Sequence, residues 1–311
     1  MITTVSLSPA IDKRMEFTAL RLAGTNRVLK MHVEGAGKAV DVALSASALG
    51  LDARCIGLLP QGGEAVSARL TACGVAHRFL PAPGVIRTNQ KLYDRQTGET
   101  TEINEAAPAA TPALLAEAER AAVEAAMDSA FLVLTGSLPQ DCPEDWYARV
   151  IERVRRDAPA CRCTLDAEGR RLLFGTAAGA WLIKPNLHEL ELAVGRSLAD
   201  RADILKAARS LLAQGPETVV VSMGAQGALA VSAGAAYYAP AVSVSVRTTT
   251  GAGDAMVAGL LYGFLQGPGL DHALRCGVAA AAARCAYGGE RYVDGAMFAE
   301  FCSRAEVTRL E

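Results

Sequence analysis

One short segment near the end of the chain combines the residue types needed to bind an anion and to move a proton. Residues 248–264 read TTTGAGDAMVAGLLYGF, so Gly251, Ala252 and Gly253 lead into Asp254 and then into an apolar run that predicts a helix. Glycines permit a sharp turn and a close approach of the backbone to a ligand. The free N–H groups at a helix start favour an anion. An acid at that point could act as a general base.

The same segment also has a purely structural explanation, in which Asp254 only caps the helix, and these residues alone leave both explanations open. Two better-known glycine motifs fit the chain poorly. The pair Gly37-Lys38 is followed by Ala39 and lacks the upstream glycine of a Walker loop. A dinucleotide fingerprint needs a third glycine where Met256 stands, and it belongs near a first strand.

Two polar segments that follow predicted strands carry further candidate ligands. The segment SMGAQG at 222–227 has small residues that would let a nucleotide phosphate pass close to the backbone, or that would form a glycine hairpin. In the segment that begins at Lys184, Asn186 can cap the next helix and Glu189 could hold a water of hydrated Mg²⁺. A simple capping box of Asn186 with Glu189 is the alternative.

Four basic residues lie in or beside two polar segments of the amino-terminal third: Arg27, Lys38, Arg87 and Lys91. Because Arg87 and Lys91 are four residues apart in a strand-like run, both should point to the same face. Such cations suit a phosphate group. Solvated surface charge is the alternative for each of them.

Buried strands that alternate with helices should position these residues. The continuous apolar runs predict strands, and Ala/Leu/Glu/Arg-rich stretches predict helices. The pattern indicates a parallel sheet covered on both faces, with ligands at the carboxyl ends of its strands. The strands are ITTVSL, ARCIGLL, AFLVLTGS, RCTLDA, AWLIKPN and TVVVSMG, with the strand-like SVSVRTT before Gly251; the helices are Ala39–Gly50, Thr111–Asp128, Pro143–Asp157, His188–Val194 and Asp203–Gln214, and residues 253–286 are almost all helix-forming.

Two turn-punctuated segments, at about 13–35 and 85–105, interrupt this pattern. They alternate partly between polar and apolar residues, and the second contains Thr97-Gly98 between strand-like halves, which is a hairpin signal. We predict a small antiparallel sheet, inserted between the first units of the main sheet, that serves as a lid or a dimer contact.

Composition narrows the function classes. The 311 residues suit one large α/β domain with an insertion, or two domains, and the net charge of −2 favours neither nucleic acid nor an anionic membrane. No signal peptide or membrane span is expected. The eight cysteines read as reduced thiols of a cytoplasmic protein, and the four histidines form no metal motif. Catalysis should therefore use carboxylate, lysine, arginine and backbone groups.

Taken together and in order, these segments resemble the ribokinase-like sugar kinases of the PfkB family, most closely the 1-phosphofructokinase and tagatose-6-phosphate kinase branch. The resemblance spans nearly the whole chain and rests on nine motifs: LSPAID at 7–12, TNRV at 25–28, AGKAVDVA at 36–43, IRTNQKL at 86–92, TEINE at 101–105, TGSLP at 135–139, IKPNLHELE at 183–191, SMGAQGAL at 222–229 and TGAGDAMVAG at 250–259.

The resemblance implies one α/β domain over residues 1–311, a three-layer sandwich with a mostly parallel central sheet and a small β-sheet lid. It implies a cytoplasmic kinase that uses ATP and Mg²⁺ to phosphorylate a hydroxyl of a sugar or sugar phosphate. Fructose 1-phosphate, converted to fructose 1,6-bisphosphate, is the best single substrate. A homodimer formed through the lid is also expected.

The resemblance also assigns roles to single residues. Asp254 would be the general base, and Gly251, Ala252 and Gly253 would form the anion hole for the transferring phosphoryl group. The nucleotide and its hydrated Mg²⁺ would be held by Lys184, Asn186, Glu189, Ser222, Gly224 and Gly227. The sugar and its phosphate would be held by Asp12, Arg27, Gly37, Lys38, Asp41, Arg87 and Lys91.

The sugar loop departs from the family pattern. The family usually reads Gly-Gly-Lys-Gly-x-Asn where this chain has AGKAVD at 36–41. Ala39 adds a methyl group, and Asp41 replaces an amide by an acceptor-only carboxylate, which disfavours a nearby phosphate unless Lys38 or another cation pairs with it. A kinase of a neutral sugar or nucleoside is therefore the alternative, followed by a sugar-phosphate sensor without catalysis.

Overall fold

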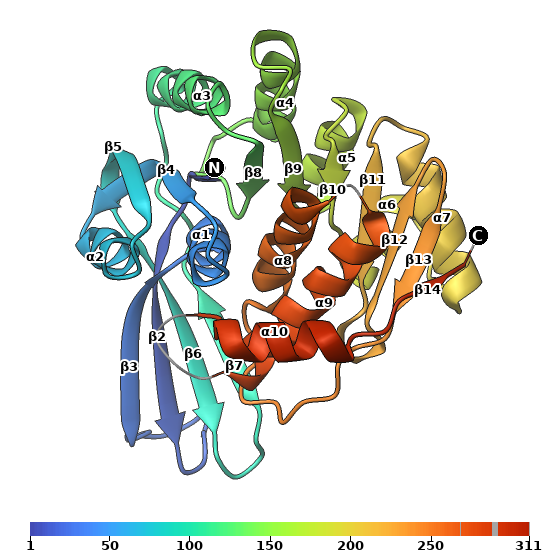
Figure 1. Ribbon diagram of the computed structural model, residues 1–311. Helices are drawn as coiled ribbons and strands as arrows, with labels where there is room; N and C mark the ends of the chain where they lie inside the picture. The colour runs from blue at the N-terminus through green and yellow to red at the C-terminus, as the bar shows by residue number, and fades with distance from the viewer. Residues whose placement is uncertain (268, 288–291, 311) are drawn as a thin grey trace.

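The computed structural model describes residues 1–267, 269–287 and 292–310, and its main feature is a large central sheet (Figure 1). In the described part of the chain this sheet runs in the order β14-β13-β12-β11-β10-β9-β8-β1-β4-β5. Its strands are β1 (Ile2–Ser6), β4 (Ala53–Gln61), β5 (Ala76–Val85), β8 (Phe131–Thr135), β9 (Arg162–Asp166), β10 (Leu182–Ile183), β11 (Thr218–Ser222), β12 (Ala228–Ser232), β13 (Ala236–Ala239) and β14 (Thr308–Arg309).

The strands from β11 to β5 are parallel, and β12, β13 and β14 pair antiparallel at one edge. Strands such as β1 and β8 are buried along their whole length, which explains why they read as continuous apolar runs. All six strands predicted as apolar runs are present, although β10 is reduced to two residues.

Helices cover both faces of this sheet and make the structure a three-layer α/β fold, as predicted (Figure 1). One hydrophobic cluster packs α1, α2, α8, α9 and α10 against one face, and a second packs α3, α4, α5, α6 and α7 against the other. The helices are α1 (Lys38–Ala48), α2 (Glu64–Ala72), α3 (Pro112–Ala126), α4 (Trp146–Asp157), α5 (Gly169–Ala177), α6 (Leu187–Val194), α7 (Arg201–Leu212), α8 (Ala252–Gln266), α9 (Leu270–Ala286) and α10 (Gly295–Arg304).

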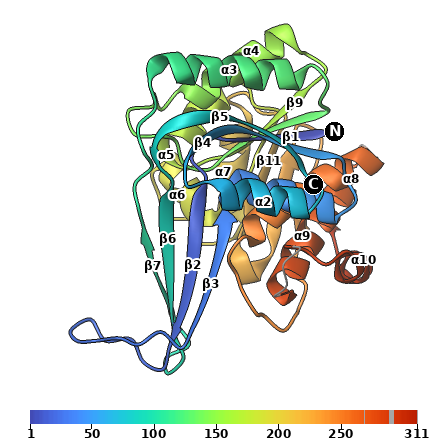
Figure 2. The ribbon, with the colours of Figure 1, turned by 90° about the vertical axis from the view of Figure 1, so that its left-hand side faces the viewer.

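The predicted second sheet is present and projects from the carboxyl ends of β1 and β5 (Figure 2). Its order is β3-β2-β6-β7, with β2 (Ala10–Phe17), β3 (Lys30–Ala36), β6 (Arg87–Asp94) and β7 (Thr100–Asn104). The prediction that it is purely antiparallel was wrong, because β2 and β6 pair in parallel. Both strands continue directly from parallel strands of the main sheet, so they leave it in the same direction.

The prediction of a strand at 243–249 was also wrong. This segment has no ladder partner among the residues that the structure describes, and Arg247 N–H donates instead to the carbonyl of Cys285 at the end of α9. The alternating pattern SVSVRTT is typical of a strand, but the edge of β13 is paired with β14, which comes from the end of the chain. Alternation alone cannot reveal that a sheet edge is already occupied.

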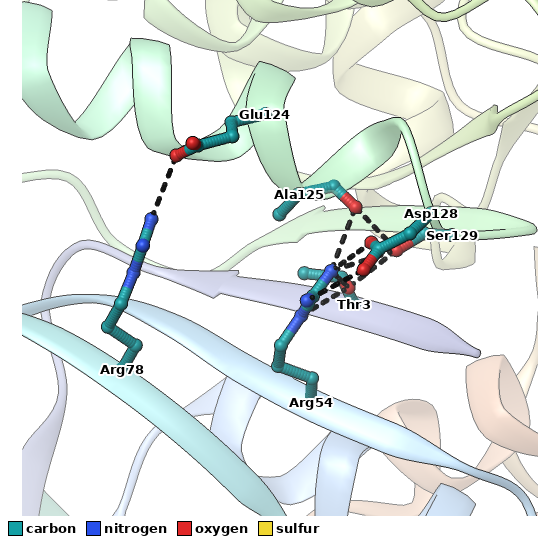
Figure 3. Close-up of polar contacts among 7 residues, drawn as sticks. All are labelled: Thr3, Arg54, Arg78, Glu124, Ala125, Asp128 and Ser129. Atoms are coloured by element: carbon teal, nitrogen blue, oxygen red, sulfur yellow. Dashed lines mark hydrogen bonds and ion pairs between the residues drawn. The ribbon is translucent and has the colours of Figure 1, made fainter.

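Arginine contacts fix α3 at the amino ends of the strands, on the side opposite the candidate site. Figure 3 shows Arg54 of β4 extending past Thr3 to Asp128, 2.6 Å from its carboxylate, and to the carbonyl of Ala125. The polar loops lie at the opposite, carboxyl ends of the strands, together with the second sheet and the start of α8. No helix in the described ranges is long and apolar enough to cross a membrane.

Candidate functional site

A polar cavity of about 290 Å³ lies between the carboxyl ends of the main strands and the second sheet. It collects side chains from β2, β6, the start of α1 and the start of α8, although these segments lie far apart along the chain. Eight of the predicted site residues line it: Asp12, Gly37, Lys38, Asp41, Arg87, Lys91, Gly251 and Asp254.

Asp254 is the third residue of α8, and the residue is only 7% exposed. The alternative in which it caps the helix is wrong, because the N-cap is Gly251, with φ of 79°, and no side chain of the described residues caps this end. Burial raises the pKa of Asp254 well above its usual range, and the neighbouring carboxylates Asp41 and Asp166 raise it further, against Lys38 and Lys184. A carboxylate with a raised pKa is a better proton acceptor than an ordinary one.

Asp166 is a site residue that the sequence reasoning missed. It ends β9 and is 2% exposed, with Lys184 Nζ 3.4 Å and Lys38 Nζ 4.0 Å from its Oδ1. Burial acts to raise the pKa of Asp166, but the two lysines together hold it below its usual value. The only signal in the sequence was the polar loop DAEG at the end of a predicted strand, where parallel sheets place ligands.

The Lys184 ammonium lies at the start of α8, and Lys38 lines the polar cavity together with Gly251 and Asp254. A Cβ built on Gly253 would lie 3.5 Å from Lys184 Nζ. Asp166 raises the pKa of Lys38 above its usual value although burial opposes it, and Asp254 adds to the effect. Two positive charges therefore lie near the start of α8, whose free N–H groups also favour an anion, and together these groups make an anion site.

A second, apolar cavity of about 520 Å³ lies on the other side of the same loop. Ala252 and Gly253 line it, together with the predicted residues Ser222, Gly224 and Gly227 and with apolar side chains such as Val246. The glycine hairpin from β11 to β12 is also present, so both interpretations of SMGAQG apply. The size and the apolar lining of this cavity suit a planar aromatic ligand.

Asn186 and Glu189 form the capping box that was the alternative interpretation. Asn186 Oδ1 accepts from Glu189 N–H at 2.9 Å, and Glu189 Oε2 accepts from Asn186 N–H at 2.8 Å. They line neither of the two cavities, although Asn186 forms an isolated parallel β-bridge with Ser222, which lines the apolar cavity. Burial raises the pKa of Glu189, and its Oε1 makes no hydrogen bond within the described ranges.

Arg27, like Lys184, Asn186 and Glu189, is a predicted residue that lines neither cavity, and it alone lies far from both. It is exposed on the segment between β2 and β3, which extends away from the body of the molecule (Figure 2).

The cations of the polar cavity differ in whether a carboxylate neutralises their charge. Lys91 is paired with Asp12, which also accepts from Asn89 Nδ2 at 2.9 Å. Arg87 donates to Ser8 Oγ at 3.0 Å and has no carboxylate partner within the described part of the chain. Arg87 is therefore the cation with charge still available for an anionic ligand.

Comparison with known proteins identifies the family. The family model described as pfkB family carbohydrate kinase matches residues 7–294. The chain is 32% identical over 310 residues to the 1-phosphofructokinase of Escherichia coli (strain K12), covering 98% of this chain and 97% of that protein. It is 34% identical over 280 residues to the 1-phosphofructokinase of Rhodobacter capsulatus, covering 89% and 88%.

A solved structure is similar to this chain over nearly its whole length. The crystal structure of phosphofructokinase-2 from Escherichia coli in complex with substrates and products superposes with a TM-score of 0.91, at 27% identity, over 97% of this chain and 98% of that one. The polar cavity, the anion site and the apolar cavity thus stand in a fold shared with sugar-phosphate kinases. The chain belongs to the pfkB family of carbohydrate kinases, phosphotransferases that act on an alcohol group of a sugar.

Proposed function

We propose that this protein uses ATP to phosphorylate a ketohexose phosphate, with fructose 1-phosphate as substrate and fructose 1,6-bisphosphate as product. The observation that carries the proposal is the position of the Gly251–Asp254 loop between a polar cavity and an apolar one. Asp254 faces the polar side and Gly253 the apolar side. A sugar hydroxyl and a nucleotide phosphate would therefore meet at this loop. The names of the relatives support the same substrate class.

In this proposal the chain contributes mainly position and charge, as expected for phosphoryl transfer. Asp254 accepts the proton of the attacking hydroxyl. The N–H groups of Ala252 and Gly253 bind the transferring phosphoryl group, and the ammonium groups of Lys38 and Lys184 stabilise its charge. Asp166 keeps these two ammonium groups in place.

The apolar cavity would take the base of ATP, and Ser222, Gly224 and Gly227 would lie along its phosphates. At Gly224 a side chain would meet nothing within 4 Å, so the backbone is open to a ligand there. No group of three or more His, Cys, Asp or Glu within the described ranges could hold a metal alone. This fits Mg²⁺, which usually binds through one or two carboxylates together with substrate phosphates and waters.

Glu189 Oε1, which the capping box leaves free, would bind one water of that Mg²⁺, with Asn186 keeping the carboxylate in place. When bound, Mg²⁺ would neutralise charge on the nucleotide phosphates. In the polar cavity Asp12 and Asp41 would accept from sugar hydroxyls, Gly37 would lie close to the sugar, and Arg87 and Lys91 would bind its phosphate.

A substrate panel tests the proposal. Purified protein with Mg-ATP is given fructose 1-phosphate, fructose 6-phosphate and tagatose 6-phosphate, and ADP release is followed in a coupled assay. We expect turnover of fructose 1-phosphate with the highest kcat/KM of the three. No turnover of any of them would reject the proposal.

A kinase of a neutral sugar or nucleoside is the second candidate, and the carboxylate of Asp41 in the polar cavity favours it. A negative group there repels a phosphate placed beside it. The panel therefore includes fructose, ribose and adenosine. A higher kcat/KM for one of these than for every phosphosugar would select the second candidate.

We also propose a homodimer formed through the second sheet. Met31, Val33 and Ile103 are 59%, 46% and 50% exposed, and the pairing register places all three on the face turned away from Asp12 and Lys91. An exposed apolar face of this kind is a typical interaction site. A phosphofructokinase-2 from Escherichia coli, one of the structural relatives, has been solved as a tetramer.

If the dimer forms through this apolar face of the second sheet, a charge introduced there should weaken dimerisation. Val33→Asp should raise the dimer dissociation constant about thirtyfold or more, because the carboxylate would lose its water in the interface. Analytical ultracentrifugation measures the change. Leu192→Asp, at a side chain of α6 that is 60% exposed, is the matched control and should leave the dimer intact. A wild-type protein that sediments as a monomer would exclude the dimer.

A further inference from the structure

Asp41 stands in a wall between two cavities. It lines the polar cavity and also an adjoining outer cavity of about 190 Å³. The outer cavity is bounded mainly by charged side chains, of which Arg69 does not reach the polar cavity. Asp41 is 9% exposed, and its Oδ1 has no hydrogen-bond partner within the described part of the chain. A buried carboxylate oxygen without a donor is costly, so this one can accept from a ligand or from the neighbouring Tyr292 hydroxyl, which also lacks a partner within the described residues.

The cation beside Asp41 is Arg69 of α2, whereas the sequence pointed first to Lys38, which lies against Asp166. Arg69 Nη1 lies 3.5 Å from Asp41 Oδ1, an ion pair without a hydrogen bond. The same guanidinium donates to the Gly35 carbonyl at 2.7 Å and lies 2.8 Å from Glu34 Oε2. Two carboxylates therefore share one arginine, whose side chain is 13% exposed.

Arg69 also contacts Tyr292, which packs against the Gly251–Asp254 loop. Its guanidinium carbon lies 5.5 Å from the ring centroid of Tyr292, and that of Arg284 lies 4.0 Å from the same ring. The Tyr292 hydroxyl in turn occupies the space where a side chain of Gly251 would be, since a Cβ there would lie 1.6 Å from it. The guanidinium is thus held between the second sheet and the ring that packs under the anion site.

Charged and titratable groups from several elements surround Asp41. The pKa of Asp41 is raised to about 7, chiefly by burial and also by Asp12 and Glu34, against the opposing effect of Arg69 and Arg284. The groups that face it are Asp12, Glu34, Cys55, Arg69, Asp254, Arg284 and Tyr292.

We propose that Arg69 is a positioning residue of the sugar site, which keeps Asp41 ionised and oriented as an acceptor for a substrate hydroxyl. This inference rests on the proposed function and adds the orientation of the substrate. The end of the sugar that lies at Asp41 carries an uncharged donor, a hydroxyl group. The phosphate lies at Arg87, which has no carboxylate partner in the described ranges. A phosphate at the Asp41 end would meet a buried negative charge.

The test is the pH profile of kcat/KM for the phosphosugar that the wild type prefers. Arg69→Gln removes the positive charge, so the pKa of Asp41 rises and the acid limb of the profile moves to higher pH. At pH 6.5 we expect a loss of about tenfold in kcat/KM relative to the wild type, recovered in part at pH 8.5. Glu34→Gln removes the competing carboxylate and is the matched variant with the opposite sign, because its acid limb should move to lower pH.

The double variant separates positioning from simple damage to the fold. In the Asp41→Asn background no carboxylate titrates at this position, so adding Arg69→Gln should change kcat/KM by less than about threefold at either pH. An equal, pH-independent loss in both backgrounds would overturn the proposal, as would an acid limb that does not move. Melting temperatures of all four variants show whether each is folded.

A second readout does not need turnover. Asp41 has a raised pKa in the folded state, so its contribution to stability is favourable at low pH and is lost as pH rises toward that pKa. Arg69→Gln should therefore lower the melting temperature more at pH 8 than at pH 5.5, and Asp41→Asn should abolish that difference. If the wild type phosphorylates no phosphosugar, the proposed function fails, and this readout still accepts or rejects the Arg69–Asp41 pair.

Discussion

Replacing Asp254 by asparagine is expected to lower kcat by about 10²–10⁴-fold, the usual contribution of a general base. The amide has nearly the same shape and cannot accept the proton of the hydroxyl. Because the carboxylate is buried and its pKa is raised, removing its charge should not destabilise the fold. Steady-state kinetics measure kcat, and isothermal titration calorimetry should show ATP binding within about threefold of the wild type.

Asp271→Asn is the matched control for this variant. Asp271 lies in the first turn of α9, as Asp254 does in α8, but it is exposed and lines neither cavity. Its kcat should equal that of the wild type. A kcat for Asp254→Asn close to wild type would remove Asp254 from the role of base.

Replacing Gly251 by alanine should lower kcat about 100-fold, the cost that a displacement of about 1 Å can have at a reacting centre. Gly251 has φ of 79°, where an alanine is strained, and the new Cβ would overlap the Tyr292 hydroxyl. The helix start must then move, and with it the N–H groups of Ala252 and Gly253. KM for the sugar should change less than kcat, because the sugar-side residues on β2 and β6 do not move.

Gly234→Ala provides the control for a glycine substitution as such. Gly234 lies between β12 and β13, its backbone is outside the left-handed region, and a Cβ there meets nothing within 4 Å. This variant should have wild-type kcat and melting temperature. Wild-type kinetics for Gly251→Ala would show that the anion site does not depend on this helix start.

Much of the fold could be predicted because its signals are local. The continuous apolar runs, the alternation in the second sheet and the glycine before Asp254 each concern a few neighbouring residues. The parallel pairing of β2 with β6 was missed, because it depends on the directions in which β1 and β5 leave the main sheet. The segment 243–249 was taken for a strand because its alternation carries no information about β14.

The candidate site divides in the same way. Asp254, Lys38 and Arg87 stand in recognisable motifs, and the structure places all three in the polar cavity. Asp166 and Arg69 stand in no motif that sequence reasoning used. Their importance comes from partners distant in the chain, Lys38 for Asp166 and Asp41 for Arg69, which only the strand order and the packing of α2 bring together.

The most direct test of this account is to identify, by ³¹P NMR, the product formed from fructose 1-phosphate and Mg-ATP by the purified protein. The account predicts fructose 1,6-bisphosphate, formed in equal amount with ADP and not formed by Asp254→Asn at a comparable rate. Absence of the bisphosphate from a protein that binds ATP, or faster phosphorylation of a neutral sugar under the same conditions, would contradict it.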